Sequence, residues 1–487
     1  MIGLYTAEEV RAAEAPLLAA APEGALMQRA ATGLATVCLR LLGRAHGTRV
    51  TALVGAGDNG GDALFAGAHL AGRGVRVTAV LLDPGRAHAA GLAALRRAGG
   101  RVAGAGGATG LDRADLVLDG IVGIGGRGGL RPAAARLAAQ AAAGPGLVVA
   151  VDLPSGVDPD TGAVEGEAFT AQHTVTFGAV KAGLVVGEGR RHAGQVHLVD
   201  IGLAGTLPRP RTVRLTDADV AARLDPPTDD DDKYSRGVVG VVAGSSTYPG
   251  AAVLCTGAAL RTRPGLVRYA GTAAAGVRAA WPEAIVTEGR PADAGRVQAW
   301  VVGPGLGTDD DAADVVAEVL ATDLPVLLDA DALTMAARRP DLVRDRDAPT
   351  VLTPHDREYG RLGGEVGADR IGAARRLAAD LGAVVLLKGA ATVVAAPGGQ
   401  AYVNGTGSPW LATAGTGDVL SGIAGALLAT GLPPAEAAAV AAHVHGRAGQ
   451  LAAADGPLVA GDLVRRLPGT LALLHRDGSG DLGDWNV

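Results

Sequence analysis

The sequence predicts an α/β protein built from two doubly wound domains, each around a largely parallel sheet. Short apolar segments typical of buried strands alternate with longer helical segments, and this alternation begins twice, near Arg49 and near Gly237. The 487 residues exceed the roughly 250 to 300 residues at which single cores stop growing, so more than one domain is expected. Gly-rich turns and acidic residues follow the strands directly, where open α/β sheets bind ligands.

The composition excludes several classes of protein. A net charge of -6, spread along the chain, gives no indication of a nucleic-acid partner. The two cysteines, Cys38 and Cys255, lie far apart in sequence and form neither a disulfide framework nor a metal cluster. The apolar helical segments are rich in Ala and Gly, and the first residues carry glutamates where a secretion signal has an apolar core. We therefore expect a cytoplasmic protein without a membrane partner, and a homo-oligomer.

Lysine is scarce, with three residues against 41 arginines. In such a background a retained lysine points to work that arginine cannot do, because the two differ in shape, hydration and pKa range. Lys181, Lys233 and Lys388 therefore stand out.

The first half begins with a helical region over residues 1–48, followed by a strand, a Gly-rich turn, a helix and a second strand. This βαβ unit has neither the GxGxxG dinucleotide fingerprint nor the P-loop lysine, which disfavours an NAD-dependent oxidoreductase. The predicted elements are a strand at 49–55, a turn at 56–62, a helix to about Arg73, strands at 75–82, 115–119 and 147–151, and a helix at 132–143.

Polar side chains follow the strands of this half. Because the carboxyl ends of parallel strands meet at one edge of a sheet, we expect these side chains to converge. Each one alone is also an ordinary turn former. Their oxygen atoms, without His or Cys, fit a hard cation of the alkali or alkaline-earth type. The residues are Asn59, Asp62, Asp119, Asp152 and Ser155.

The second half follows a proline-rich and acidic stretch at 209–233, interpreted as a linker with the start of the next domain. Domains are expected at 1–208 and 234–487. The predicted strands lie at 237–243, 300–302, 325–328, 350–352 and 384–387, a hairpin at 391–403, and helices at 251–261, 417–430 and 434–453.

The stretch from Asn404 to Asp418 is the most informative part of this half. It ends in Gly415-Thr416-Gly417-Asp418 before an apolar helix, which places free backbone N–H groups, a positive dipole end and one carboxylate together. This arrangement suits an anion and a hydroxyl that loses a proton, although an ordinary capped helix is the simpler reading. Lys388 follows a strand, where it is expected to meet phosphates. His355 is either a helix cap or a ligand donor, and His443 and His445 are read as core residues on different helix faces.

Residues 1–205 contain the motifs GxGDNGGDA at 55–63, VLDGIVGIGGRG at 117–128, VDLPSGVDPDTG at 151–162, TVTFGAVKAGL at 174–184 and VDIGL at 199–203. On these motifs rests a resemblance to the NAD(P)H-hydrate epimerase family. It implies a Rossmann-like domain in which Asn59, Asp119 and Ser155 hold K⁺ and Asp152 contacts substrate as the acid/base group. The family usually has NNGGDG, where this chain has Asp58 and Ala63. The implied contacts to the hydrated nucleotide are Asp58, Asn59, Gly60, Gly61, Asp62, Gly123, Ile124, Gly125, Gly126, Arg127, Gly128, Gly129 and Asp152.

Residues 212–470 contain the motifs KYSRGVVGVVAGSSTYPGAA, VVGPGLG, LDADAL, LTPHDREYGRL, LLKGAAT and NGTGSPWLATAGTGDVLSG. Through these motifs they resemble the ADP-dependent NAD(P)H-hydrate dehydratase family, which has the ribokinase-like fold. Trp410 and Ala414 stand where the common form, NPGMATGGTGD, has smaller residues. The resemblance implies substrate contacts at Ala252, Gly305, His355 and Asp418, and nucleotide contacts at Lys388, Gly389, Ala390, Ala391, Thr392 and Gly417.

Together the two resemblances imply a repair enzyme for hydrated nicotinamide cofactors, NADHX and NADPHX. The first domain would interconvert the R and S hydrates with K⁺. The second would use ADP, with Mg²⁺, to phosphorylate the S hydrate, Asp418 taking the proton, and would restore NAD(P)H with release of AMP and phosphate. The alternative is a ribokinase-like small-molecule kinase fused to a non-catalytic binding domain.

Overall fold

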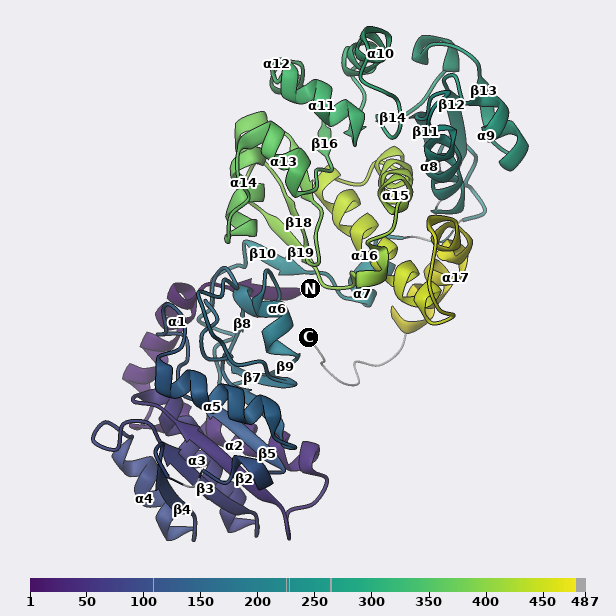
Figure 1. Cartoon of the computed structure of the whole chain (residues 1–487). Coiled ribbons are helices and arrows are strands. Elements are labelled where there is room, and N and C mark those ends of the chain that lie inside the picture. Colours follow the sequence, from purple (N-terminus) through teal and green to yellow (C-terminus); the bar gives the residue numbers. More distant parts are fainter. Residues whose placement is uncertain (108, 225, 227, 263–264, 479–487) are drawn as a thin grey trace. The chain divides into compact units, whose positions relative to one another are not determined.

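The computed structural model describes residues 1–107, 109–224, 226, 228–262 and 265–478. The chain forms two compact units whose boundary falls between Arg211 and Thr212 (Figure 1). Both are α/β units, as the alternation of strands and helices predicts.

The first unit is built on a wholly parallel sheet with the strand order β4-β3-β2-β5-β6-β7-β9. The central strands β2, β3, β5 and β6 are rich in Val, Leu and Ala and largely buried on both faces, as expected for a sheet covered by helices on both sides. One apolar cluster joins the sheet to α2 and α3, and another joins its opposite face to α5. The strands are β2 (Arg49–Val54), β3 (Arg76–Leu81), β4 (Arg101–Gly104), β5 (Leu116–Gly120), β6 (Leu147–Val151), β7 (His173–Phe177) and β9 (Gln195–Val199).

Helices connect the parallel strands of this unit, and the strand order β4-β3-β2-β5-β6 is that of a doubly wound sheet. Gly57, with a φ of 100°, caps the start of α3 after β2. A capping box between Thr6 and Glu9 starts α1. The helices are α1 (Ala7–Ala20), α2 (Ala25–Leu42), α3 (Asp58–Gly72), α4 (Ala89–Arg97), α5 (Pro132–Ala143) and α6 (Gly189–Ala193), with 3₁₀ turns η1 (Leu111–Arg113) and η2 (Ala182–Leu184).

One prediction for this unit is wrong in part. Residues 1–48 were expected to be helical, but β1 (Ile2–Tyr5) is a strand that pairs with β8 (Val180–Lys181). Four residues are too few for a periodicity to separate strand from helix, and the pairing partner lies far away in the sequence.

The second unit carries the strand order β13-β12-β11-β14-β15-β16-β17-β18-β19-β10. The strands from β13 to β17 are parallel, whereas β18 runs antiparallel to both of its neighbours and forms the predicted hairpin with β19. The strands are β10 (Thr212–Arg214), β11 (Val238–Val242), β12 (Leu266–Ala270), β13 (Ile285–Thr287), β14 (Ala299–Val302), β15 (Val326–Leu328), β16 (Thr350–Leu352), β17 (Val384–Leu387), β18 (Thr392–Ala395) and β19 (Ala401–Asn404).

Strand β10 and helix α7 both lie inside the stretch 209–233, and β10 pairs in parallel with β19. The helices are α7 (Asp217–Ala221), α8 (Pro249–Thr262), α9 (Ala274–Ala280), α10 (Asp310–Leu320), α11 (Asp331–Arg338), α12 (Asp341–Arg344), α13 (Asp356–Gly363), α14 (Arg370–Leu381), α15 (Thr416–Ala429), α16 (Pro434–Ala453) and α17 (Ala460–Gly478), with η3 (Pro291–Ala294) and η4 (Pro409–Leu411).

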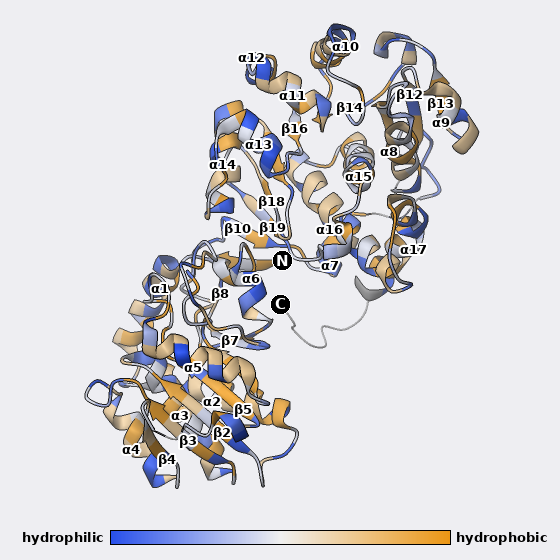
Figure 2. Ribbon diagram, viewed as in Figure 1, coloured by the Kyte–Doolittle hydropathy of each residue, from blue (hydrophilic) through white to orange (hydrophobic). Residues whose placement is uncertain are grey.

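The core of the second unit surrounds α15, in which every residue from Val419 to Ala429 is buried. Small residues let its neighbours approach, since a Cβ on Gly422 would lie 2.2 Å from the Cys255 carbonyl oxygen of α8. Figure 2 shows the sheets of both units largely in hydrophobic colours. These apolar helices belong to the core, and within the part of the chain that the structure describes none is long and apolar enough to cross a membrane.

Candidate active sites

Asp152 stands at the end of β6 in the first unit and forms a buried ion pair. Its Oδ1 atom accepts hydrogen bonds from Lys181 Nζ at 2.5 Å, from Thr176 Oγ1 at 3.1 Å and from the Phe177 backbone N–H at 3.2 Å. The Lys181 side chain is 1% exposed and that of Asp152 is 10% exposed. Asp152 also has a φ of 67°, an uncommon conformation for a residue with a Cβ, and such strain is concentrated at functional sites.

A second polar group beyond these strands joins Asp119 on β5 to Ser155. Asp119 accepts hydrogen bonds from Ser155 Oγ and from the Ser155 backbone N–H, both at 2.7 Å. Burial raises the pKa of Asp119 to about 6, and the Ser155 hydrogen bonds oppose this rise. Asn59 Oδ1 lies 3.0 Å from the position of a Cβ on Gly123, in the loop whose Val122 N–H donates to Ser155 Oγ. Asn59, Asp119 and Ser155 therefore lie around one loop, and each can offer an oxygen atom as a ligand to a cation.

The first turn of α3 carries the predicted contacts from Asp58 to Asp62. Gly60 is required sterically, because a Cβ there would lie 2.4 Å from the Gly55 carbonyl oxygen. Asp58 is exposed, but Asp62 Oδ1 is buried without a hydrogen-bond partner in the described structure. Burial, followed by the charges of Asp152 and Asp58, raises the pKa of Asp62 well above its usual range. Such an orphaned acceptor fits a ligand that supplies a donor.

The loop from Gly123 to Gly129 is anchored near both of its ends. Arg11 of α1 donates to the Ile124 carbonyl oxygen at 2.8 Å. A Cβ on Gly129 would lie 1.9 Å from the Glu165 carbonyl oxygen, so the loop packs directly on a neighbouring segment. The remaining residues of the loop, Gly125, Gly126, Arg127 and Gly128, lie between these two anchors.

In the second unit, Lys388 at the end of β17 is held by acidic side chains. Lys388 Nζ donates to Asp329 Oδ1 at 2.8 Å and lies 3.6 Å from Glu358 Oε2. Burial disfavours the charge of Lys388, but Asp329 and Glu358 outweigh this and raise its pKa. Asp329 Oδ2 accepts from Ser421 Oγ at 2.7 Å, and despite its burial the pKa of Asp329 is lowered, mainly by Lys388.

His355 is a helix cap, one of the two roles that the sequence left open. Its Nδ1 atom accepts from the Glu358 N–H at 3.1 Å, and Glu358 Oε2 accepts from the His355 N–H at 2.8 Å. This capping box orients Glu358 toward Lys388, so His355 joins the site through Glu358.

The first turn of α15 faces this lysine. Gly415 has a φ of 85° and caps the helix, so Thr416, Gly417 and Asp418 are its first three residues. A Cβ on Gly417 would lie 3.8 Å from Lys388 Nζ and 3.9 Å from Asp329 Oδ2. Burial, followed by the charge of Asp329, raises the pKa of Asp418 to about 7, and Lys388 opposes this rise. A helix terminus, a lysine and a carboxyl that titrates near neutrality thus meet at one point.

The other predicted contacts of this unit form two groups. A Cβ on Gly305, whose φ is 61°, would lie 2.8 Å from Ala251 Cβ and 3.0 Å from Tyr248 Cβ, next to buried Ala252. In the turn after β17, Arg370 donates to the Lys388 carbonyl oxygen at 2.8 Å. Gly389, Ala390 and Ala391 form this turn, and Thr392 begins β18.

The structure adds residues that the sequence interpretation did not place in a site. Lys181 was singled out by its rarity but given no role. Asp329 follows β15 directly within LDADAL, a position that marks strand-end ligands, whereas Glu358 and Ser421 carry no such signal. Lys233, the third rare lysine, lies exposed with its Nζ 5.3 Å from the Tyr234 ring centroid.

The structure is a two-unit α/β protein in which each unit carries a buried Lys–Asp pair beyond the carboxyl end of a largely parallel sheet. A family model described as NAD(P)H-hydrate dehydratase matches residues 239–468, and one described as YjeF-related protein N-terminus matches residues 23–183. A ribokinase-like superfamily protein from Enterococcus faecalis V583 has 26% sequence identity and a TM-score of 0.51, covering 55% of this chain and 98% of that one.

Two relatives match nearly the whole length. One, from Mycobacterium tuberculosis, is 57% identical over 89% of this chain and 91% of the relative. Another, from Mycobacterium leprae, is 55% identical over 93% of this chain and 95% of the relative. Both are named bifunctional NAD(P)H-hydrate repair enzyme Nnr. This chain belongs to the family of bifunctional NAD(P)H-hydrate repair enzymes.

Proposed function

We propose that the chain repairs hydrated nicotinamide cofactors, with the first unit interconverting the R and S forms of NADHX and NADPHX and the second dehydrating the S form with ADP. The observation that carries the dehydratase is the meeting of Asp418, the Gly417 backbone and Lys388. A carboxyl that titrates near neutrality is matched to general-base work. A helix N-terminus beside an ammonium group is matched to a phosphate.

The reaction starts with transfer of the β-phosphoryl group of ADP to the hydroxyl oxygen of the hydrate. Asp418 takes the hydroxyl proton as the new P–O bond forms, and the bond to the α-phosphate oxygen breaks to release AMP. Lys388 and the Gly417 N–H stabilise the charge on the moving group. Phosphate then leaves the ring carbon, a proton leaves the neighbouring carbon, and the ring double bond of NAD(P)H is restored.

Mg²⁺ is proposed to arrive with the nucleotide. Among the described residues, no cluster of three or more His, Cys, Asp or Glu forms a metal site. Mg²⁺ is commonly bound through phosphates with one or two carboxylates and several waters, and Asp329 is already engaged by Lys388 and Ser421. The ion supplies charge neutralisation on the phosphates, and Lys388 supplies the fixed positive charge of the protein.

The dehydratase is tested with the pure S hydrate, ADP and Mg²⁺. We expect the absorbance of reduced nicotinamide to return with one AMP and one phosphate released per molecule, which phosphorus NMR counts. A stable phosphorylated product without that absorbance would instead indicate a small-molecule kinase.

For the first unit we propose that Asp152 is the acid/base group of the epimerase. Inverting a carbon that carries a hydroxyl and a ring nitrogen requires proton transfer at one of them. The three hydrogen bonds to the Asp152 side chain all reach Oδ1, and within the described residues none reaches Oδ2, which is left for substrate. Asp152→Asn is expected to abolish interconversion of the two hydrates, measured by chromatography without ADP.

K⁺ fits the group formed by Asn59, Asp119 and Ser155, because the donors are oxygens and the Asp119 carboxylate is wholly buried. When bound, the ion supplies a fixed positive charge near the substrate phosphates. We expect K⁺ to raise the melting temperature of the first unit more than choline at equal ionic strength, and Asp119→Asn to remove the difference. The homo-oligomer and the cytoplasmic location stay predictions.

A further inference from the structure

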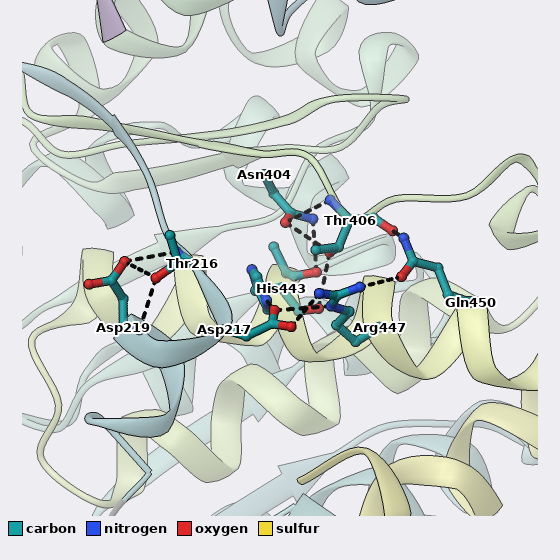
Figure 3. Close-up of polar contacts among 9 residues, drawn as sticks. Thr216, Asp217, Asp219, Asn404, Thr406, His443, Arg447 and Gln450 are labelled. Carbon is teal, nitrogen blue, oxygen red and sulfur yellow. Dashed lines mark hydrogen bonds and ion pairs between the residues drawn. The ribbon is translucent and has the colours of Figure 1, made fainter. Parts of the chain in front are cut away.

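Helix α16 carries the loop that contains the dehydratase site. At the start of the loop, Asn404 Nδ2 donates to the Ala442 carbonyl oxygen at 2.9 Å, and Thr406 Oγ1 donates to the His443 carbonyl oxygen at 3.1 Å. Gln450 Nε2 donates to the Thr406 carbonyl oxygen at 2.9 Å (Figure 3). At the other end, His445 Nε2 lies 2.9 Å from the Thr416 carbonyl oxygen. One helix therefore holds both ends of the loop.

Two glycines inside α16 allow this contact. A Cβ on Gly446 would lie 2.1 Å from Thr406 Oγ1, and one on Gly449 would lie 2.6 Å from Leu411 Cδ2. Glycine within a helix costs about 0.5 to 1 kcal/mol relative to alanine, so these positions favour the loop contact over helix stability.

Helix α16 is itself anchored to helix α7. His443 Nε2 lies 2.6 Å from Asp217 Oδ1 of α7, and Arg447 also pairs with Asp217 (Figure 3). Burial opposes the charge of Asp217, but the hydrogen bonds from His443 and Arg447 outweigh it and lower the pKa of Asp217 to about 2. The helix is thus a fixed support for the loop.

His445 connects helix α16 to the first turn of α15. Burial lowers the pKa of His445 to about 4, so the ring is neutral near pH 7 and Nε2–H donates to the carbonyl of Thr416. That carbonyl and the Gly417 N–H belong to the same planar peptide group, so fixing one fixes the direction of the other. Gly417 is the residue whose Cβ position lies 3.8 Å from Lys388 Nζ.

We propose that His445 is a positioning residue of the dehydratase: its bond to the Thr416 carbonyl orients the Gly417 N–H and the first turn of α15, and with them Asp418, toward the transferred phosphoryl group. The inference rests on the proposed dehydratase function. It replaces the sequence interpretation of His445 as simple core packing, because the ring donates to a specific carbonyl of the reacting turn.

The test compares His445→Gln with His445→Asn in the full-length protein. Glutamine places its amide near the position of Nε2 and retains the donor, whereas the shorter asparagine does not reach Thr416. We expect kcat of the Gln variant within about threefold of wild type and that of the Asn variant about 10- to 100-fold lower, since misplaced catalytic groups cost up to about 100-fold. KM for ADP is expected to change less than about threefold in both, because ADP retains Lys388.

His443→Asn is the matched control, with the same substitution on the same helix but on the side that faces Asp217. Arg447 still pairs with Asp217 in this variant, so we expect it to lower the melting temperature and leave kcat within about twofold of wild type. Hydrogen exchange of residues 411–420 is expected to rise in His445→Asn and not in His443→Asn.

Equal kcat in the Gln and Asn variants of His445, or unchanged exchange of the loop in His445→Asn, would overturn the inference. A wild-type protein that fails to regenerate reduced nicotinamide from the S hydrate would instead overturn the proposed function.

Discussion

The two units each hold a lysine against a buried aspartate beyond the carboxyl end of the sheet, but they use the pair differently. In the first unit Lys181 pairs with Asp152, the proposed acid/base group itself. In the second, Lys388 pairs with Asp329, while Asp418 has no ion-pair partner among the described residues and its pKa is raised to about 7. Both pairs lie at a residue of positive φ, namely Asp152 in the first unit and Ala330, next to Asp329, in the second.

The comparison indicates that the same kind of Lys–Asp pair has a different proposed role in each unit. A lysine bound to the reacting carboxylate holds it in place. In the proposed dehydratase, a lysine bound to a neighbouring aspartate is kept charged for a phosphate, while the Asp418 carboxyl is left to accept a proton near neutral pH.

The largest expected effect on dehydratase activity comes from replacing Asp418, the proposed general base. Asp418→Asn removes the base and is expected to lower dehydratase kcat by about 1,000-fold, within the range of general-base contributions. ADP binding, measured by calorimetry, should be equal or tighter, because a negative charge near the phosphates is lost. An Asn variant that retains a tenth of the wild-type rate would remove Asp418 from the proposed role.

Removing each lysine tests the two pairs against one another. Lys181→Met leaves the buried Asp152 charge unpaired and is expected to destabilise the first unit by about 3 kcal/mol. Lys388→Met should cost less, because the Lys388 side chain is 20% exposed against 1% for Lys181, so water can approach the carboxylate that is left behind. Hydrogen exchange of β6 and β15 in denaturant measures each unit separately, with Lys233→Met as the surface control. Equal losses in the two units would contradict the comparison.

The pH dependence of the dehydratase should report Asp418. A base must be ionised to act, so kcat/KM for the S hydrate is expected to rise with pH through about 7. At pH 6 the rate should be about 10-fold below its plateau, as a single group with this pKa requires. A profile that is flat from pH 6 to 8 would contradict the assignment.

The free energy of unfolding should also depend on Asp418, but it should fall as pH rises, whereas the activity rises. The pKa of Asp418 is raised in the folded state, so its contribution to stability is present at low pH and is lost as pH rises through about 7. Asp418→Asn should therefore be more stable than wild type at pH 8, by about 1 to 2 kcal/mol after allowance for solvent screening, and nearly equal at pH 4. Urea unfolding at the two pH values measures this, and a variant less stable than wild type at pH 8 would contradict it.

The strand ends were predictable from sequence, because acidic residues and glycines directly follow buried apolar runs. This placed Asp119, Asp152, Lys388 and Asp418 at the ends or starts of the elements that carry them. The fold class is confirmed as well. It was predictable because alternating strands and helices are compatible with few topologies.

The pairings were not predictable, because the partners are distant in sequence. Lys181 lies 29 residues from Asp152, and Lys388 lies 59 residues from Asp329. Helical periodicity placed His445 on an inner face of α16 but named no partner for its ring. The scarcity of lysine was the one signal that marked both pairs in advance.

The most direct test of two separate sites in one chain is a mixing experiment with the R hydrate, ADP, Mg²⁺ and K⁺. Asp152→Asn alone should regenerate reduced nicotinamide no faster than the hydrate epimerises spontaneously, and Asp418→Asn alone should regenerate none. An equimolar mixture of the two variants should restore the initial rate toward that of wild type, because one supplies the S hydrate that the other consumes. A mixture no faster than Asp152→Asn alone would contradict the account.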